Sequence, residues 1–302
     1  MEVSIVIVNY NVKQLILECI GSIYKYFKCV TFEIIIVDNN SRDDSINAIK
    51  TTYPEVIIIE NKFNAGFSGA TNQGMEIAKG DYIFLLNPDT YLIDESVCKL
   101  IGFIKEKKNN VLVAPRLLNN DRTLQYSAWK DKELFVILQE SFQIYRSAYK
   151  LETFSSPRAV DNVMGAAMVF PKELIAKVGN FDSDIFWQDD FDFCYRVRKY
   201  GIPVVYYPDA TIVHYFNQSA VKNVNVYYAN LIISKLKLYR KHHSGFKVTL
   251  VVLLTLIHIM AYIIFLLMIS PFSKHYRDKL IPYLYTFRKF IIFMFTGKIS
   301  WA

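Results

Sequence analysis

The sequence predicts an α/β fold in which helices cover both faces of a mostly parallel central sheet, followed by an apolar and basic helical tail. Two observations predict the sheet. Short, continuously apolar runs alternate with segments of helical spacing, and these runs are rich in β-branched residues. Such strands are typical of parallel sheets that are buried on both faces. A third observation, a long apolar stretch near the C-terminus, predicts the tail.

The first 115 residues carry the regular part of this pattern. The expected strands are residues 3–8, 32–37, 56–60, 81–86 and 111–115, and the expected helices are residues 12–27, 43–52, 66–79 and 96–107. Ligands of parallel sheets bind beyond the carboxyl ends of the strands. The residues that follow each strand are therefore the first candidates for a site.

The pattern is less regular after residue 115. Residues 116–160 mix aromatic and charged side chains and are interpreted as a connector that faces the ligands, and residues 162–171 are apolar again. Gly201 has the position of a C-cap glycine after a helical segment. The elements expected here are a helix at 189–200, short strands at 204–207 and 211–213, and a helix at 221–241 that leads out of the domain.

The net charge of +7 is distributed unevenly. Residues 235–302 contain eleven Lys and Arg but one acid, Asp278, so the rest of the chain is slightly acidic. Basic charge interleaved with apolar runs favours an anionic membrane surface as a partner. A nucleic-acid partner is not expected, because it would require the basic charge on the folded body.

Within this tail, residues 248–270 are apolar except for Thr249, Thr255, His258 and Ser270. At about 1.5 Å per residue, this run is long enough to cross a hydrocarbon core of about 30 Å. Residues 291–295 are too short to span and fit an interfacial helix. Three alternatives stay open for the longer run: a span, a re-entrant or in-plane segment with both basic flanks on one side, and a buried core or dimer helix.

The four cysteines, Cys19, Cys29, Cys98 and Cys194, form neither a CxxC motif nor a zinc-like spacing with histidine. The N-terminus begins with a strand-like run and not with a signal peptide. Reduced, buried thiols in a cytoplasmic setting are therefore expected.

Polar residues follow three expected strands: Asn9, Asp38 and Asp89. A carboxylate at the rim of a parallel sheet is placed to contact a ligand, although Asp and Asn also favour turns. Residues 64–70 follow another strand and open a helix, with glycines at 66 and 69. This loop is neither a Walker loop nor GxGxxG, but the N-terminus of its helix favours an anion.

Asn87-Pro88-Asp89 offers a carboxylate and an amide oxygen to a divalent metal, or forms a simple strand-ending turn. His214 follows an expected strand and is either a metal ligand or structural.

Residues 186–193 set three acids, Asp189, Asp190 and Asp192, among aromatic side chains. An apolar setting raises the pKa of a carboxylate, which suits a general base. Acids in a first helical turn also stabilise the helix dipole, and both explanations can hold together. We assign Asp189 or Asp190 to the ligand and Asp192 to the structure.

Five segments in order resemble family 2 glycosyltransferases, and most closely the rhamnosyltransferase-like branch. The resemblance covers roughly residues 2–220, and its segments are residues 4–11, 36–41, 64–67 with Asn72, 87–89 and 187–196. It implies a GT-A fold, which is Rossmann-like, and transfer of a sugar with inversion of configuration.

On the donor side, the resemblance implies that Asp38 contacts the nucleotide base and that Asn9 and Asn40 lie near the nucleoside. It further implies that the diphosphate–sugar pocket includes Asn64, Gly66, Asn72 and Asn87.

Asp89 matches the last position of the family's DxD metal motif, for which the cofactor is Mg²⁺ or Mn²⁺. Asn87 stands at the first position, so one carboxylate of that motif is missing. His214 matches a histidine that ligates metal in some relatives, and is expected to complete the site with Asp89.

On the acceptor side, Asp190 matches the second acid of the family's Glu-Asp motif and is the expected catalytic base. Asp189 replaces the Glu of that motif. Gly165 and Ala166 match the segment beside the acceptor.

We therefore expect a glycosyltransferase domain at 1–220, with a nucleotide-sugar half at 1–115 and an acceptor and base half at 116–220. A connecting helix at 221–247 and a membrane-associated region at 248–302 follow. The expected donor is a dTDP-, UDP- or GDP-linked sugar, rhamnose or a related hexose. The expected acceptor is a lipid-linked glycan of bacterial surface polysaccharide synthesis, at the cytoplasmic face of the inner membrane.

Three alternatives carry different signatures. A non-catalytic nucleotide-binding scaffold at the membrane would not need Asp190. A sugar nucleotidyltransferase usually has a Gly-rich, basic loop after its first strand, which residues 9–12 lack. A processive synthase would carry a QxxRW motif and several spans, and the sequence has neither.

Overall fold

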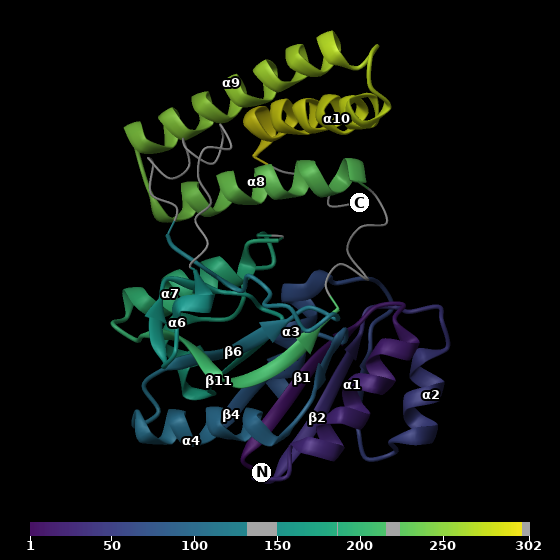
Figure 1. Cartoon of the computed structure of the whole chain (residues 1–302), viewed down its shortest axis with the longest axis vertical. Helices are drawn as coiled ribbons and strands as arrows, with labels where there is room; N and C mark the ends of the chain where they lie inside the picture. The colour runs from purple at the N-terminus through teal and green to yellow at the C-terminus, as the bar shows by residue number, and fades with distance from the viewer. Residues whose placement is uncertain (132–149, 186, 216–223, 298–302) are drawn as a thin grey trace. The chain divides into compact units, whose positions relative to one another are not determined.

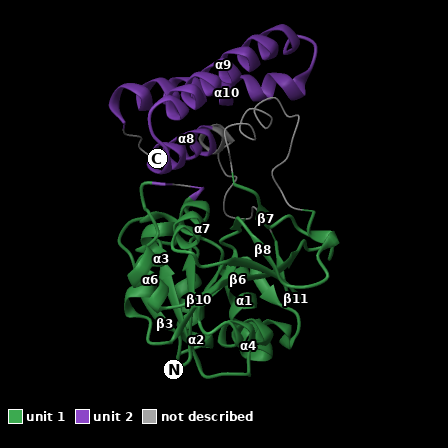
Figure 2. Ribbon diagram, turned by 90° about the vertical axis from the view of Figure 1, so that its left-hand side faces the viewer, with its two compact units in different colours: residues 1–131, 148–184, 189–219 green, residues 132–147, 185–188, 220–302 purple. Residues whose placement is uncertain are grey.

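The computed structural model describes residues 1–131, 150–185, 187–215 and 224–297 (Figure 1). Parts of the expected connector at 116–160, the start of the helix expected at 221–241 and the last five residues of the tail lie outside the described residues. The chain divides into two compact units (Figure 2). The first comprises residues 1–131, 148–184 and 189–219, and the second comprises residues 132–147, 185–188 and 220–302.

The first unit contains one large mixed sheet with the order β3-β2-β1-β4-β10-β6-β11-β5, and β8 also pairs with β11. Four neighbours run parallel: β1 (Val3–Asn9), β2 (Phe32–Asp38), β3 (Ile57–Glu60) and β4 (Tyr82–Leu86). The remaining strands are β5 (Thr90–Leu92), β6 (Leu112–Leu118), β8 (Arg158–Val160), β10 (Ala167–Pro171) and β11 (Val204–His214). Two short strands, β7 (Ala128–Trp129) and β9 (Asn162–Val163), pair separately.

Helices cover both faces of the sheet, as the sequence predicts. The helices are α1 (Lys13–Tyr26), α2 (Ser45–Thr52), α3 (Gly66–Ile77), α4 (Cys98–Glu106), α6 (Glu173–Val178) and α7 (Asp189–Lys199), with 3-10 turns at Glu95–Val97 and Leu151–Thr153. Val3, Ile5 and Ile7 of β1 belong to the core that α1, α2 and α4 close. Val6 and Val8 belong to the core of α3, α6 and α7. Alternate strand residues point to opposite faces, which explains why β1 is apolar at consecutive positions from Ile5 to Val8.

The parallel strands bring their polar ends to one edge of the sheet. Asn9, the last residue of β1, lies directly beside Asp38, the last residue of β2. Val6 of β1 pairs with Leu85 of β4, so the turn that holds Asp89 follows at the same edge. The predicted rim of strand-end residues is therefore present.

Two expectations about the first unit were wrong. The short strands expected at 204–207 and 211–213 form one strand, β11, with a register shift between Tyr207 and Thr211. Cys29 and Cys98, expected as reduced thiols, form a disulfide, whereas Cys19 and Cys194 are free and buried as expected. The pairing joins residues 69 positions apart, so no local spacing could indicate it.

The described part of the second unit consists of α8 (Val224–His242), α9 (Phe246–Ile269) and α10 (Lys274–Thr296). The three helices share an apolar core that includes Leu236 of α8, Ile259 of α9 and Phe290 of α10. Within the described residues, α9 is long and apolar enough to cross a membrane. The interfacial segment expected at 291–295 is the end of the much longer α10.

Candidate active site

The side chains of Asn9 and Asp38 form a buried polar pair at the ends of β1 and β2. Asn9 Nδ2 donates to Asp38 Oδ1 at 2.7 Å and to Ser45 Oγ at 2.7 Å. The other carboxylate oxygen of Asp38 accepts the backbone N–H of Ser41 at 2.9 Å. Asn9 therefore orients Asp38 through its amide, and Asp38 stands at the rim with both oxygens held in place.

Asn39, which the sequence did not indicate as a site residue, holds the loop at residues 64–66, called here the donor-side loop. Its Nδ2 donates to the carbonyl of Gly66 at 3.1 Å, and its Oδ1 accepts the N–H of Ala65 at 3.2 Å. Asn64 Oδ1 accepts the N–H of Gly66 at 2.9 Å. Gly66 has φ +74°, a left-handed conformation that favours glycine, where α3 begins. The only signal in the sequence was an amide next to a strand-end Asp.

The remaining donor-side candidates have different surroundings. Asn40 is exposed and has a left-handed backbone with φ 64°. The side chain of Asn72 forms a reciprocal pair with the backbone of Phe181, with N···O distances of 2.8 and 3.0 Å. This pair fastens α3 to the segment before α7. The ligand contacts expected of Asn40 and Asn72 stay predictions.

Asp89 and His214 face each other below the surface of the first unit. His214 Nε2 lies 3.3 Å from Asp89 Oδ1, and each side chain is 5% exposed. Antiparallel pairing of β5 with β11 creates this contact, since His214 is opposite Thr90 in the ladder. The structure thus brings together the two residues expected to share a metal, although 125 positions separate them in the chain.

Gln125 determines which nitrogen of His214 carries the proton. Gln125 Nε2 donates to Asn119 Oδ1 at 2.8 Å and to the His214 carbonyl at 3.2 Å. This leaves Gln125 Oε1 as the atom 2.8 Å from His214 Nδ1, so Nδ1 is the donor. In the neutral ring Nε2 is then an acceptor, and it faces a second acceptor, Asp89 Oδ1. A cation bound between His214 Nε2 and Asp89 Oδ1 would interact favourably with both atoms.

These residues fit a divalent cation as a partial site. A carboxylate oxygen and an imidazole nitrogen are suitable ligands, and their 3.3 Å separation is close to the edge of an octahedral shell, about 3 Å for bonds of about 2.1 Å. Among the residues that the structure describes, no three or more His, Cys, Asp and Glu side chains gather as a metal site. Asp89 and His214 therefore leave most of the coordination shell to other oxygen atoms.

Asp190 lies at the N-terminus of α7 and accepts two backbone hydrogen bonds. Its Oδ2 accepts the N–H of Gly165 at 2.9 Å, and its Oδ1 accepts the N–H of Phe191 at 2.8 Å. A Cβ at position 165 would lie 3.3 Å from the Asp190 Cβ, so glycine permits this close approach. As a whole residue Asp190 is half-buried.

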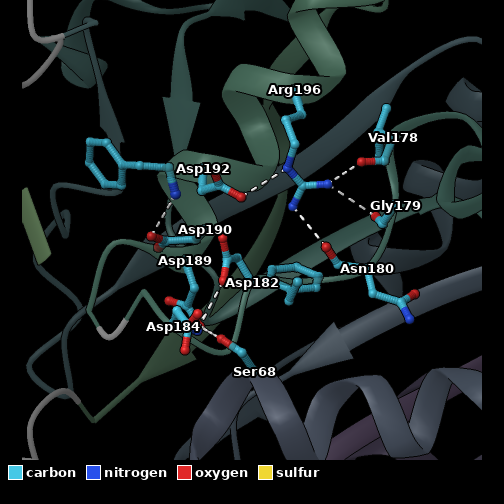
Figure 3. Close-up of polar contacts among 12 residues, drawn as sticks. Ser68, Val178, Gly179, Asn180, Asp182, Asp184, Asp189, Asp190, Asp192 and Arg196 are labelled. Carbon is cyan, nitrogen blue, oxygen red and sulfur yellow. Dashed lines mark hydrogen bonds and ion pairs between the residues drawn. The ribbon is translucent and has the colours of Figure 1, made fainter. Parts of the chain in front are cut away.

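Asp189 points away from these groups toward α3. Its Oδ2 accepts the hydroxyl proton of Ser68 at 2.6 Å (Figure 3). Burial raises the pKa of Asp189 to about 6, and the Ser68 hydrogen bond opposes that rise. Burial, together with the charge of Asp189, raises the pKa of Asp190 to about 7. The pair therefore titrates near neutral pH, as the aromatic setting predicted.

Asp192, assigned to the structure, forms a buried ion pair with Arg196 of the next helical turn, at 2.8 Å. The Arg196 guanidinium also donates to the carbonyls of Val178, Gly179 and Asn180 (Figure 3). These bonds attach α7 to the end of α6 and so fix the helix that presents Asp190.

A short series of contacts connects the Asp89 turn to Asp190. The backbone N–H of Asn87 donates to the carbonyl of Ala166 at 2.8 Å, and Gly165, the preceding residue, donates to Asp190. Antiparallel pairing of β10 with β4 places these two segments side by side. The metal-side and base-side candidates therefore lie on adjoining segments of the first unit.

A family model described as "Glycosyl transferase family 2" matches residues 4–179, more than half of the chain. The chain belongs to glycosyl transferase family 2. The family membership expected from the five motifs is confirmed, and the narrower resemblance to the rhamnosyltransferase-like branch stays a prediction.

Three curated relatives illustrate this membership. A poly(ribitol-phosphate) beta-glucosyltransferase of Bacillus spizizenii is 34% identical over 146 residues, 47% of this chain and 23% of that protein. The glucosyltransferase WfaP of Escherichia coli, named for UDP-Glc and alpha-D-GlcNAc-diphosphoundecaprenol, is 37% identical over 110 residues, 35% of this chain and 42% of that protein. The uncharacterized glycosyltransferase YwdF of Bacillus subtilis is 27% identical over 228 residues, which are 73% of this chain and 78% of that protein. The matched regions thus span less than half of the first two relatives.

Two solved structures share the fold. The mannosyltransferase of Pyrobaculum calidifontis in complex with GDP-Man and Mn²⁺ aligns with a TM-score of 0.61 at 16% identity, covering 99% of this chain and 88% of its own. TarS of S. aureus aligns with a TM-score of 0.52 at 17% identity, covering 77% of this chain and 40% of its own. At these identities the likeness concerns the fold alone, and it confirms the GT-A architecture of this family 2 chain.

Proposed function

We propose that this chain is an inverting glycosyltransferase that moves a sugar from a nucleoside-diphosphate sugar to a hydroxyl group of a lipid-linked saccharide. The observation that carries the proposal is Asp190: a half-buried residue whose carboxylate has a raised pKa and is held by two backbone N–H groups at a helix N-terminus. A base of this kind accepts a proton from an alcohol at neutral pH.

The reaction balances around this carboxylate. The acceptor oxygen forms a bond to the anomeric carbon while the bond from that carbon to the diphosphate oxygen breaks. Asp190 takes the acceptor proton, and the electron pair of the broken bond leaves with the nucleoside diphosphate. Attack from the face opposite the leaving group inverts the anomeric centre.

The donor side is proposed to bind through the other rim residues. Asp38, held by Asn9, is the proposed contact of the nucleotide base, and the loop at Asn64 and Gly66 lies at the N-terminus of α3, which favours the diphosphate. Asp89 and His214 would hold a divalent cation, which stabilises the charge on the departing diphosphate when bound.

The nature of the substrates is proposed from the relatives. One relative is named for a UDP-Glc donor and a diphosphoundecaprenol-linked acceptor, and another for a glucosyl transfer to poly(ribitol-phosphate). UDP-glucose is therefore the first donor to test, with dTDP-rhamnose and a GDP-linked hexose beside it. The basic, apolar tail supports a lipid-linked acceptor at the cytoplasmic face of a bacterial membrane.

The test is a donor screen on the purified full-length protein with a polyprenyl-diphosphate saccharide and Mn²⁺, with products identified by mass. One donor is expected to yield a product one hexosyl residue heavier. The Asp190→Asn variant is expected to reduce kcat by about 10²–10⁴-fold, whereas Asp209→Asn, at an exposed carboxylate, leaves it unchanged.

Two results would overturn the proposal. If no donor is transferred or hydrolysed, the chain is not the proposed enzyme. If Asp190→Asn keeps full transferase activity, Asp190 is not the base and the catalytic assignment fails.

A further inference from the structure

The exposed face of α9 is entirely apolar along most of its length. From residue 250 to residue 269, every exposed side chain of this helix is hydrocarbon or thioether. The large ones are Leu253, Ile257, Met260, Ile264, Leu267 and Met268, each 45–61% exposed. Their spacing of three and four residues places them on one stripe of the helix.

The opposite face of α9 is occupied by its neighbour in the second unit. The rings of Tyr262 on α9 and Tyr283 on α10 lie 4.4 Å apart, and Phe265 meets Tyr276 edge-on at 5.7 Å. Ile259 and Leu266 of α9 are completely buried in the core that α8 and α10 share. Therefore α9 is one member of a packed group of helices and not a separate rod.

This packing bears on whether α9 can cross a bilayer. A helix that spans takes its packed neighbours into the hydrocarbon, and α10 carries Arg288 and Lys289 about two turns before its end. In α8, Lys235 and Lys237 occupy the middle of the segment that shares the core. Charged side chains are costly in hydrocarbon, so a group of helices with these charges is less suited to spanning than to lying at the surface.

The exposed face of α10 has the composition of a helix at a membrane surface. Four large apolar side chains of this helix are 40–86% exposed: Ile281, Leu284, Ile292 and Phe295. Successive members of this set are three, eight and three residues apart. Arg288 is exposed on the same stripe, between Leu284 and Ile292. An arginine among apolar side chains places its stem along hydrocarbon and its head at the level of phosphate groups.

We propose that α9 does not span but lies in the plane of an anionic leaflet, with its exposed apolar stripe in the acyl region and the basic residues of α10 at the headgroups. This deepens the membrane association that belongs to the proposed function, and rests on it. Both ends of α9 then stay on one side of the membrane. A lipid surface fits better than a second copy of the chain, because residues 235–302 have a net charge of +10, and two copies would repel each other there.

Topology is tested with one cysteine added at either end of α9, Ser244→Cys or Lys274→Cys, both at exposed positions, in a chain whose native free thiols, Cys19 and Cys194, are buried. The full-length variants are expressed in bacteria, inverted inner-membrane vesicles are prepared, and a membrane-impermeant maleimide is added. Both cysteines are expected to react to the same extent before detergent is added. Protection of the Lys274→Cys variant until detergent opens the vesicles, while Ser244→Cys reacts, would mean that α9 spans and would overturn the proposal.

The occupant of the stripe is tested with a matched pair, Ile264→Lys on the stripe and Ile77→Lys on α3, which are 53% and 41% exposed. Purified proteins are floated with vesicles that contain phosphatidylglycerol and with vesicles of phosphatidylcholine alone. Ile264→Lys is expected to lower binding to the anionic vesicles at least about tenfold, and Ile77→Lys to leave it unchanged. Equal binding of the two variants overturns the proposal, as does loss of a dimer by Ile264→Lys without loss of vesicle binding.

Neither measurement uses a donor or an acceptor. A failure of the transferase assay therefore leaves these outcomes unaffected, and a spanning α9 leaves the assignment of Asp190 intact.

Discussion

Ser68 of α3 and Asp189 of α7 are joined by a buried hydrogen bond of 2.6 Å across 121 residues of sequence. The bond connects the helix that follows the donor-side loop to the turn that presents Asp190. Burial raises the pKa of Asp189, and the hydrogen bond from Ser68 opposes that rise.

Removing this bond is expected to destabilise the fold. Ser68→Ala leaves a buried carboxylate oxygen without its donor, which costs about 1–3 kcal/mol in the free energy of unfolding. Urea titration at pH 7 checks the value. Ser127→Ala is the matched control, since Ser127 Oγ is buried without a hydrogen-bond partner among the described residues. Equal losses in the two variants would mean that the Ser68 bond contributes nothing.

The raised pKa values predict how stability depends on pH. Asp190 has a pKa near 3.8 when unfolded and about 7 when folded, so the folded state binds more protons between these values. The contribution of Asp190 to the free energy of unfolding is then fully present below the unfolded pKa, and it is lost as pH rises through the folded pKa. An asparagine side chain does not titrate, so the Asp190→Asn variant does not lose this contribution as pH rises.

We therefore expect the stability of Asp190→Asn relative to the original protein to be more favourable at pH 8 than at pH 4.5, by at least about 1 kcal/mol. Thermal unfolding at both pH values checks this expectation. A difference that does not change with pH would contradict the raised pKa.

Gly165→Ala tests the close approach between Gly165 and Asp190. The added methyl group lies 3.3 Å from the Asp190 Cβ, so the carboxylate must shift by a few tenths of an ångström. A shift of a positioned base is expected to lower kcat by about tenfold or more, with a smaller change in KM. Gly102→Ala is the control, because a Cβ on that helical glycine meets nothing within 4 Å and is expected to leave kcat unchanged.

Gln125 is expected to control metal affinity through the tautomer of His214. Gln125→Met removes the acceptor of the Nδ1 proton and is expected to weaken Mn²⁺ binding about 10–100-fold. Gln125→Glu retains an acceptor and should bind Mn²⁺ at least as well as Gln125→Met. Calorimetric titration with Mn²⁺ alone, without donor or acceptor, measures both. If Gln125→Met binds Mn²⁺ as tightly as the original protein, the orientation of His214 does not depend on this contact.

Local sequence patterns were sufficient for most of the sheet and for its polar rim. The apolar runs that became β1, β2 and β4 are buried on both faces, and this property predicts a covered parallel sheet. Parallel strands end at one edge, so the sequence alone predicts that Asn9 and Asp38 lie close together. The pattern of acids and aromatics around Asp190 likewise predicted its raised pKa.

The tertiary structure decided what depends on contacts between distant segments. Gln125 lies in an irregular segment with no periodicity, and only the pairing of β11 with β5 brings His214 and Asp89 together near it. The same holds for Ser68 with Asp189, and for the disulfide of Cys29 with Cys98. The length and composition of α9 allow a span, and only its packing against charged α10 favours an in-plane position. Periodicity reports which face of an element is buried, whereas a hydrogen bond or an ion pair requires the positions of both partners, which local sequence does not contain.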